Sequence, residues 1–143
     1  MKRKNKTEIN EYVEENRGQI FTLIKDLCNI PAPSHHEENR AEFCKNWLQG
    51  IGAEGVYIDE AKNVIFPLNC DGSDDITVFA AHTDTVFPDL EPMPYFDDGE
   101  KIHSPGVADD TSSVAVLMVD KKSVLTGLEI ATEVALAVSD IEK

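Results

Sequence analysis

The feature that most constrains this fold is a run of apolar, strand-forming residues that ends in an imidazole and a carboxylate. Residues 76–84 read Ile-Thr-Val-Phe-Ala-Ala-His-Thr-Asp, and this continuous apolarity favours a strand buried on both faces of a helix-covered sheet. If the chain stays extended, His82 and Asp84 lie on one face, because side chains alternate along a strand. A ligating histidine usually donates its second N–H to such a carboxylate. The stretch therefore predicts either a metal site at a strand end or a buried strand that ends in a polar turn.

Helical patterns lie before this strand. Apolar residues between positions 8 and 28 recur at steps of three, four and seven, which predicts an amphipathic helix. Ser34 and Glu37 then have the spacing of a capping box, which predicts a second helix from His35 to about Gly50. Neighbouring side chains on a helix diverge by about 100°, so His35 and His36 are expected to be surface residues rather than two ligands of one ion. The predicted buried stripe of this helix is Ala41, Cys44, Trp47, Leu48 and Ile51.

Short strands complete the expected fold. Strands are predicted at residues 56–58, 64–68 and 134–138, and Asp98-Gly99 is expected to form a turn between two extended pieces. The isolated His103 is expected to be a surface or hydrogen-bonded residue. Together the patterns predict the α/β class, with a mostly parallel or mixed sheet covered by helices.

Composition limits the function classes. With 143 residues the chain is long enough for one domain. Its 27 acidic and 13 basic residues give a net charge of −14, which would repel nucleic acid and anionic membranes. No stretch reaches the roughly 18 apolar residues of a membrane span. The three cysteines are widely spaced and odd in number, so neither a disulfide framework nor a thiolate zinc site is predicted, and a cytoplasmic location is expected.

A second group of polar residues precedes another apolar helical pattern. Residues 104–111 read Ser-Pro-Gly-Val-Ala-Asp-Asp-Thr, followed by a stretch with helical character to about residue 125. Asp109 and Asp110 therefore lie near a helix N-terminus, where negative charge is favourable. Asp110 or Thr111 could serve as a simple N-cap, but one small polar residue suffices for that. The second carboxylate is then free for another role.

Together these segments resemble a known family. Ala-His-Thr-Asp-Thr-Val at residues 81–86 and Gly-Val-Ala-Asp-Asp at 106–110, with Ile-Pro-Ala-Pro-Ser at 30–34 before them, resemble signatures of the dinuclear zinc metallopeptidases. This family includes peptidase T, carboxypeptidase G, aminoacylase and succinyl-diaminopimelate desuccinylase. The resemblance covers about residues 20–118. It implies that His82 ligates zinc, that Asp84 is the catalytic-site residue that orients His82, and that Asp109 bridges two ions and is followed by a cis peptide bond.

The resemblance also implies a reaction. Two zinc ions, or cobalt or manganese in their place, can activate a water molecule and polarise an amide carbonyl. The expected activity is therefore metal-dependent hydrolysis of a short peptide or an N-acyl amino acid.

The end of the chain departs from the family pattern. Where relatives carry a Glu-Glu pair, which supplies the general base and a ligand, residues 139–143 read Ser-Asp-Ile-Glu-Lys. Glu142 is a candidate to replace one Glu, and Asp110 is a further candidate site residue. We therefore expect residues 1–143 to form a single partial catalytic domain, without the dimerisation or lid domain and the carboxy-terminal half. The alternative is a non-catalytic metal-binding or interaction fragment. In either case an exposed sheet edge is expected to promote homo-oligomers.

Overall fold

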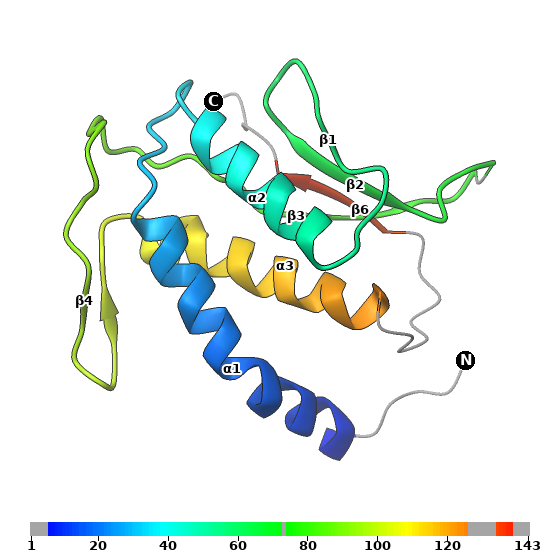
Figure 1. Cartoon of the computed structure of the whole chain (residues 1–143), viewed down its shortest axis with the longest axis horizontal. Coiled ribbons are helices and arrows are strands. Elements are labelled where there is room, and N and C mark those ends of the chain that lie inside the picture. Colours follow the sequence, from blue (N-terminus) through cyan, green and yellow to red (C-terminus); the bar gives the residue numbers. More distant parts are fainter. Residues whose placement is uncertain (1–5, 73, 126–133, 139–143) are drawn as a thin grey trace.

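Three helices lie beside a mixed sheet, and a separate hairpin projects at the opposite end of the molecule (Figure 1). The computed structural model describes residues 6–72, 74–125 and 134–138. The helices are α1 (Lys6–Cys28), α2 (Glu38–Gly50) and α3 (Ser112–Leu125), and a kinked turn η1 (Val107–Thr111) precedes α3. The strands are β1 (Tyr57–Ile58), β2 (Val64–Leu68), β3 (Thr77–Ala80), β4 (Phe96–Asp97), β5 (Ile102–His103) and β6 (Val134–Val138).

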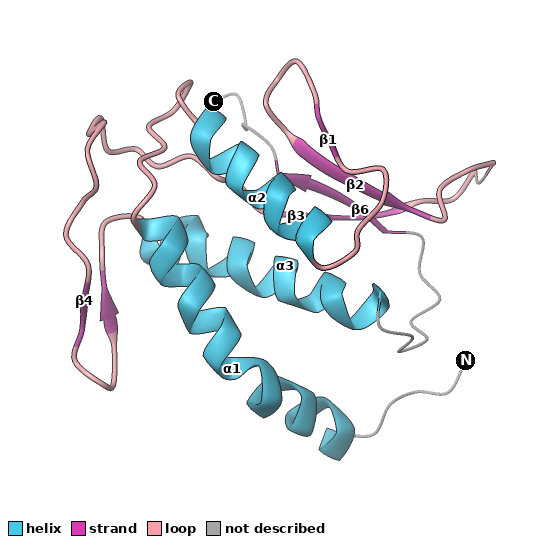
Figure 2. Cartoon of the chain, viewed as in Figure 1, coloured by secondary structure: helices cyan, strands magenta, loops and turns pink. Residues whose placement is uncertain are grey.

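The larger sheet confirms the predicted α/β class with a mixed sheet. Its strand order is β1-β2-β6-β3 (Figure 2). The β1–β2 and β2–β6 pairs are antiparallel, whereas β3 pairs with β6 in parallel, with Phe79 opposite Leu136. Strands β4 and β5 form the predicted turn-linked extended pieces around Asp98-Gly99. The helix expected at residues 8–28 and the strands expected at 64–68 and 134–138 are all present.

The core lies between the helices and one face of this sheet. The apolar stripe of α1 packs with α2, α3 and β2, and the tyrosine hydroxyl of Tyr12 donates to the carbonyl of Val119 at 2.9 Å, which links α1 to α3. Among the described residues, no helix combines the length and the apolarity that a bilayer crossing requires. Fully buried apolar residues of the core include Leu27, Ala41, Cys44, Leu48, Val64, Phe66, Ala115 and Met118, and Trp47 and Ile51 pack against them while partly buried.

The predicted burial of the 76–81 strand on both faces is wrong. All four side chains of β3 are exposed, with Val78 at 57%. The reason is position, since β3 forms an edge of the sheet and pairs only with β6 among the described strands. Apolarity marked the segment as a strand but did not specify its neighbours. An exposed sheet edge is thus present at β3, while association through it stays a prediction.

The predicted start of the second helix is also wrong. Helix α2 begins at Glu38, with Glu37 at its N-cap, and His35 has a left-handed φ of +73°. Ser34 does not cap the helix, because its hydroxyl donates to the carboxylate of Asp84 and its N–H to the carbonyl of Thr85. His35 and His36 are exposed as expected, but they precede the helix. The predicted capping box does not form, because Ser34 bonds to residues that are distant in the sequence instead of to the start of the helix.

Candidate functional site

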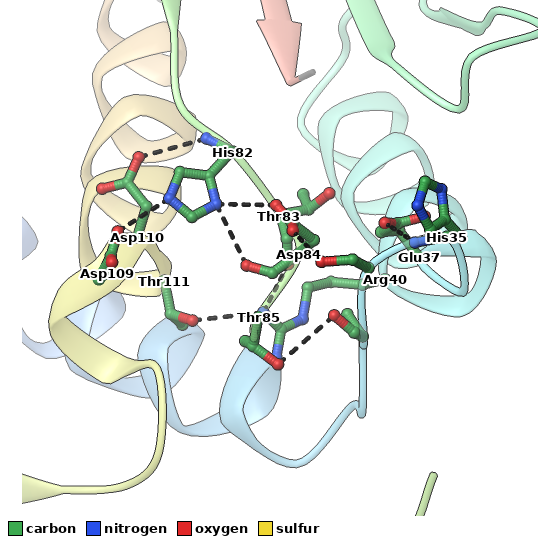
Figure 3. A network of polar contacts seen from close by, with 12 residues as sticks. His35, Glu37, Arg40, His82, Thr83, Asp84, Thr85, Asp109, Asp110 and Thr111 are labelled. Carbon is green, nitrogen blue, oxygen red and sulfur yellow. Dashed lines mark hydrogen bonds and ion pairs between the residues drawn. The ribbon is translucent and has the colours of Figure 1, made fainter. Parts of the chain in front are cut away.

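The chain stays extended beyond β3, and this places His82 and Asp84 together. The amide of Thr85 donates to the carbonyl of Ala32 at 2.7 Å, and Pro33 and Thr85 form a parallel bridge. Thr83 and Thr85 are buried, whereas His82 and Asp84 are half-buried and lie close to each other (Figure 3). The alternation predicted from the sequence therefore continues past the last ladder pair of the strand.

The imidazole of His82 lies between two carboxylates. Its Nδ1 is 2.9 Å from Oδ1 of Asp84, and its Nε2 is 2.9 Å from Oδ1 of Asp109. The side chain of Asp84 is only 18% exposed, whereas that of Asp109 is 88% exposed. Asp84 is thus a half-buried partner that orients the ring, and Asp109 faces solvent on the open side of the same ring.

The turn before α3 brings both of its acidic residues to His82. The Asp109–Asp110 peptide bond is cis, as the family resemblance implies, and both residues have non-helical backbone angles. Asp110 accepts a hydrogen bond from the main-chain N–H of His82 at 3.2 Å. The hydroxyl of Thr111 accepts one from Arg40. The side chains considered as simple caps therefore join the start of the helix to other segments.

Gly106 allows this turn to approach the β3 segment. Its φ is +73°, and a Cβ placed on it would lie 2.7 Å from Cγ2 of Thr85. Any other residue would meet both a backbone penalty and a steric one at this position. Glycine therefore lets the loop that carries Asp109 pack directly against the segment that carries His82.

Opposing effects set the pKa of His82. Partial burial lowers it, but hydrogen bonds to Asp109 and Asp84 and the negative charges of Asp84 and Asp110 raise it, and the net pKa lies above the ordinary value. These carboxylates therefore favour the protonated ring in the absence of another cation. The same negative field would favour a metal ion on Nε2 once that proton is lost.

The donor set at this point suits zinc in part. Zinc is bound in proteins by imidazole nitrogens and carboxylate oxygens, and a carboxylate on the far nitrogen of a ligating histidine is the usual support. His82 and Asp109 would be the ligands, and Asp84 would be that support. Within residues 6–72, 74–125 and 134–138, no group of three or more His, Cys, Asp or Glu side chains is arranged to hold a metal ion.

Two other predicted residues fall outside this constellation. Glu142 lies outside the described residues. His103 is exposed and pairs with Asp98 in the β4–β5 hairpin at 3.0 Å, as expected for an isolated surface histidine. The hydrogen bond from His103, followed by bonds from two main-chain amides, lowers the pKa of Asp98 to about 2.

Sequence reasoning missed Arg40. This side chain is only 2% exposed, and its guanidinium donates to the carbonyls of Leu27, Ile30 and Thr83 as well as to the hydroxyl of Thr111. Burial lowers the pKa of its guanidinium, and the negative charge of Asp84 acts in the opposite direction. A signal was present, because Arg40 shares the i, i+4, i+8 spacing of the buried Cys44 and Leu48.

Comparison with solved structures shows where this fold occurs. The dipeptidase Dug1p of Saccharomyces cerevisiae matches with a TM-score of 0.74 and 18% identity, over 95% of this chain and 34% of that one. A tripeptidase of Staphylococcus aureus matches with a TM-score of 0.69 and 19% identity, over 86% and 36%. The aminoacylhistidine dipeptidase of Vibrio alginolyticus matches with a TM-score of 0.64 and 23% identity, over 87% and 28%. The chain shares the fold of part of these peptidases.

These identities are too low to carry more than the fold. No family model matches the sequence, and no curated protein matches it at a significant level. The chain spans only 28–36% of the length of the three peptidases. An assignment of activity must therefore rest on the site itself.

We expect Gly106→Ala to destabilise the fold by about 2–4 kcal/mol, because it adds a left-handed backbone cost to a clash with Thr85. The matched control is Gly99→Ala, which has a φ of +89° but no atom within 4 Å of the added Cβ, so it should cost only about 1–2 kcal/mol. Adding Thr85→Ser to Gly106→Ala removes Cγ2 and should restore part of the loss. Urea denaturation measures the free energy of unfolding of the unaltered chain and of the three variants. Equal costs for the two alanine variants would contradict the close packing.

We expect NMR titration of the metal-free chain to give His82 a pKa above the ordinary value of about 6.5. Asp109→Asn should lower this pKa, because it removes a hydrogen bond that raises it and leaves the opposing effect of burial. Asp98→Asn is the control and should leave it unchanged. Because the folded pKa is raised, protonated His82 stabilises the fold below its unfolded pKa, and this contribution is lost as pH rises through the folded pKa. An unaltered titration in Asp109→Asn would show that the Nε2 contact does not form in solution.

Proposed function

We propose that the chain supplies part of the metal centre of a zinc-dependent peptidase or amidohydrolase. One observation carries this proposal: the ring of His82 is held through Nδ1 by the half-buried Asp84, while its Nε2 faces the exposed Asp109. A purely structural ion pair would need only one of these carboxylates. Here one ring nitrogen is fixed by Asp84 and the other faces the exposed carboxylate of Asp109. This imidazole and this carboxylate could therefore bind one cation together.

Each residue then has a defined role. His82 and Asp109 would ligate zinc, Asp109 would extend toward a second ion, and Asp84 would fix the tautomer of His82. A bound zinc ion lowers the pKa of its water and polarises a carbonyl, which is what amide hydrolysis requires at neutral pH. Cobalt or manganese could take the same donors. Asp110 remains a candidate, but its carboxylate already accepts from the N–H of His82, so a supporting role suits it better.

The substrate class follows from the fold and the expected chemistry. The compared structures are described as a tripeptidase, a dipeptidase and an aminoacylhistidine dipeptidase. We propose a short peptide or an N-acyl amino acid as substrate. The three free cysteines, two of them buried, agree with a reducing compartment, and we propose a cytoplasmic location.

A second candidate function is a metal-binding or interaction module without catalysis. It draws support from the donor count, because the described part of the chain brings only one imidazole and one exposed carboxylate to the open side of the site. Catalysis also needs a general base to move the proton of the attacking water. We propose that residues 1–143 form one part of a catalytic domain. The further ligands and the general base would then come from residues outside the described site, and Glu142 is the candidate within this chain.

We expect the purified chain to bind zinc in a chelator competition assay. His82→Ala and Asp109→Asn should each weaken binding at least about 10-fold, and Asp84→Asn should weaken it about 10- to 100-fold, as supporting carboxylates do elsewhere. His103→Ala is the matched control, since it removes an exposed imidazole that pairs with Asp98 and not with the residues of the site. If His82→Ala binds zinc as tightly as the unaltered chain, the assignment fails.

Hydrolysis separates the two candidate functions. The zinc- or cobalt-loaded chain is incubated with a panel of dipeptides, tripeptides and N-acetyl amino acids, and released amines are quantified. Turnover that disappears in His82→Ala would establish the enzyme. Zinc binding that depends on His82, without turnover of any substrate, would favour the non-catalytic module.

A further inference from the structure

We propose that Ser34 is a positioning residue for this site and acts on His82 through Asp84. This inference rests on the proposed metal-binding role of His82. The hydroxyl of Ser34 donates to Oδ2 of Asp84 at 2.6 Å, while Oδ1 of the same carboxylate accepts from Nδ1 of His82 at 2.9 Å. Both oxygens of Asp84 are therefore engaged, one on each side.

The two hydrogen bonds together determine how the carboxylate is oriented. A carboxylate held by one oxygen alone can rotate about its terminal torsion, which has a broad preference. A second, charge-assisted bond at a short distance removes much of that freedom. Ser34 is thus expected to keep Oδ1 directed at His82. Together with the main-chain carbonyl of Asp84, which lies 3.1 Å from Nδ1, this contact favours a protonated Nδ1 and leaves Nε2 available as a donor to a metal.

The backbone places Ser34 for this contact. Its N–H donates to the carbonyl of Thr85 at 3.3 Å, the amide of Thr85 donates to Ala32, and Pro33 bridges Thr85 in parallel. The segment before α2 therefore lies alongside the segment that follows β3, so that Ser34 is held beside Asp84 although 50 positions separate them. A residue that served only to form a turn would not need this pairing with the segment that carries Asp84.

The exposure of Ser34 separates this role from a packing role. Ser34 is exposed, whereas its acceptor Asp84 is largely buried. Removal of an exposed hydroxyl leaves no cavity, so its effect should appear at the site rather than in the stability of the fold. The functional and structural consequences can thus be measured independently.

The test compares Ser34→Ala, Ser34→Thr and the control Ser113→Ala, which removes an exposed hydroxyl from α3. The readout is the zinc dissociation constant of the 143-residue chain in chelator competition. Ser34→Ala should weaken zinc binding on the order of 10-fold, at the lower end for a supporting residue. Ser34→Thr keeps the hydroxyl and should restore most of the affinity, and Ser113→Ala should match the unaltered chain. Thermal midpoints of the metal-free variants should agree.

A second readout needs no metal. Nitrogen-15 NMR of the metal-free chain, at a pH where the ring of His82 is neutral, should show a smaller share of the Nδ1–H tautomer in Ser34→Ala than in Ser34→Thr. If Ser34→Ala leaves both zinc affinity and tautomer unchanged while His82→Ala abolishes zinc binding, the role of Ser34 is refuted and the proposed function stands. Equal losses in the alanine and threonine variants would also refute the hydroxyl's role. If His82→Ala leaves zinc binding intact, the proposed function itself fails.

Discussion

The buried guanidinium of Arg40 holds together the segments on which the site depends. It donates to the end of α1 through the carbonyls of Leu27 and Ile30, to the segment after β3 through Thr83, and to the start of α3 through Thr111. Burial of a charge is costly unless its donors are satisfied. Here its hydrogen bonds and the negative charge of Asp84 offset part of that cost. A planar group with five donors in fixed directions can join three segments in one arrangement, which lysine cannot reproduce.

This arrangement explains why the two acidic segments meet at one histidine. Thr83 and Thr111 are direct neighbours of the site residues in the sequence. Thr83 lies between His82 and Asp84, and Thr111 follows Asp109 and Asp110 (Figure 3). Anchoring both threonines to one rigid group fixes the distance between the His82 and Asp109 segments. Gly106 then removes the steric obstacle to their approach. Residues outside the His82, Asp84 and Asp109 constellation thus determine how its side chains are placed.

The sequence predicted the local elements well because their signals are local. Helix periodicity located α1 and the end of α2 at Gly50, and the His82–Asp84 alternation correctly placed both side chains on one side. Errors arose where long-range contacts decided the outcome. The Ser34–Glu37 box gave way to a bond between Ser34 and Asp84, and β3 took an edge position that apolarity alone could not reveal. Arg40 was missed because a charged residue in a helical stripe is ordinarily a solvated one.

Electrostatics connects these details to the chemistry. Asp84 and Asp109 contact the imidazole of His82, and Asp110 accepts from the main-chain N–H of the same residue, in a chain whose net charge is −14. In isolation this concentration of negative charge is unfavourable, and a proton on His82 or a cation on its open side would relieve it. Arg40 is directed into the protein interior and its bonds are made to main-chain and hydroxyl oxygens, so it offsets the field without closing the site. The arrangement therefore keeps a negative, partly exposed surface beside Nε2 of His82, and this surface supports the proposal that a divalent cation binds there.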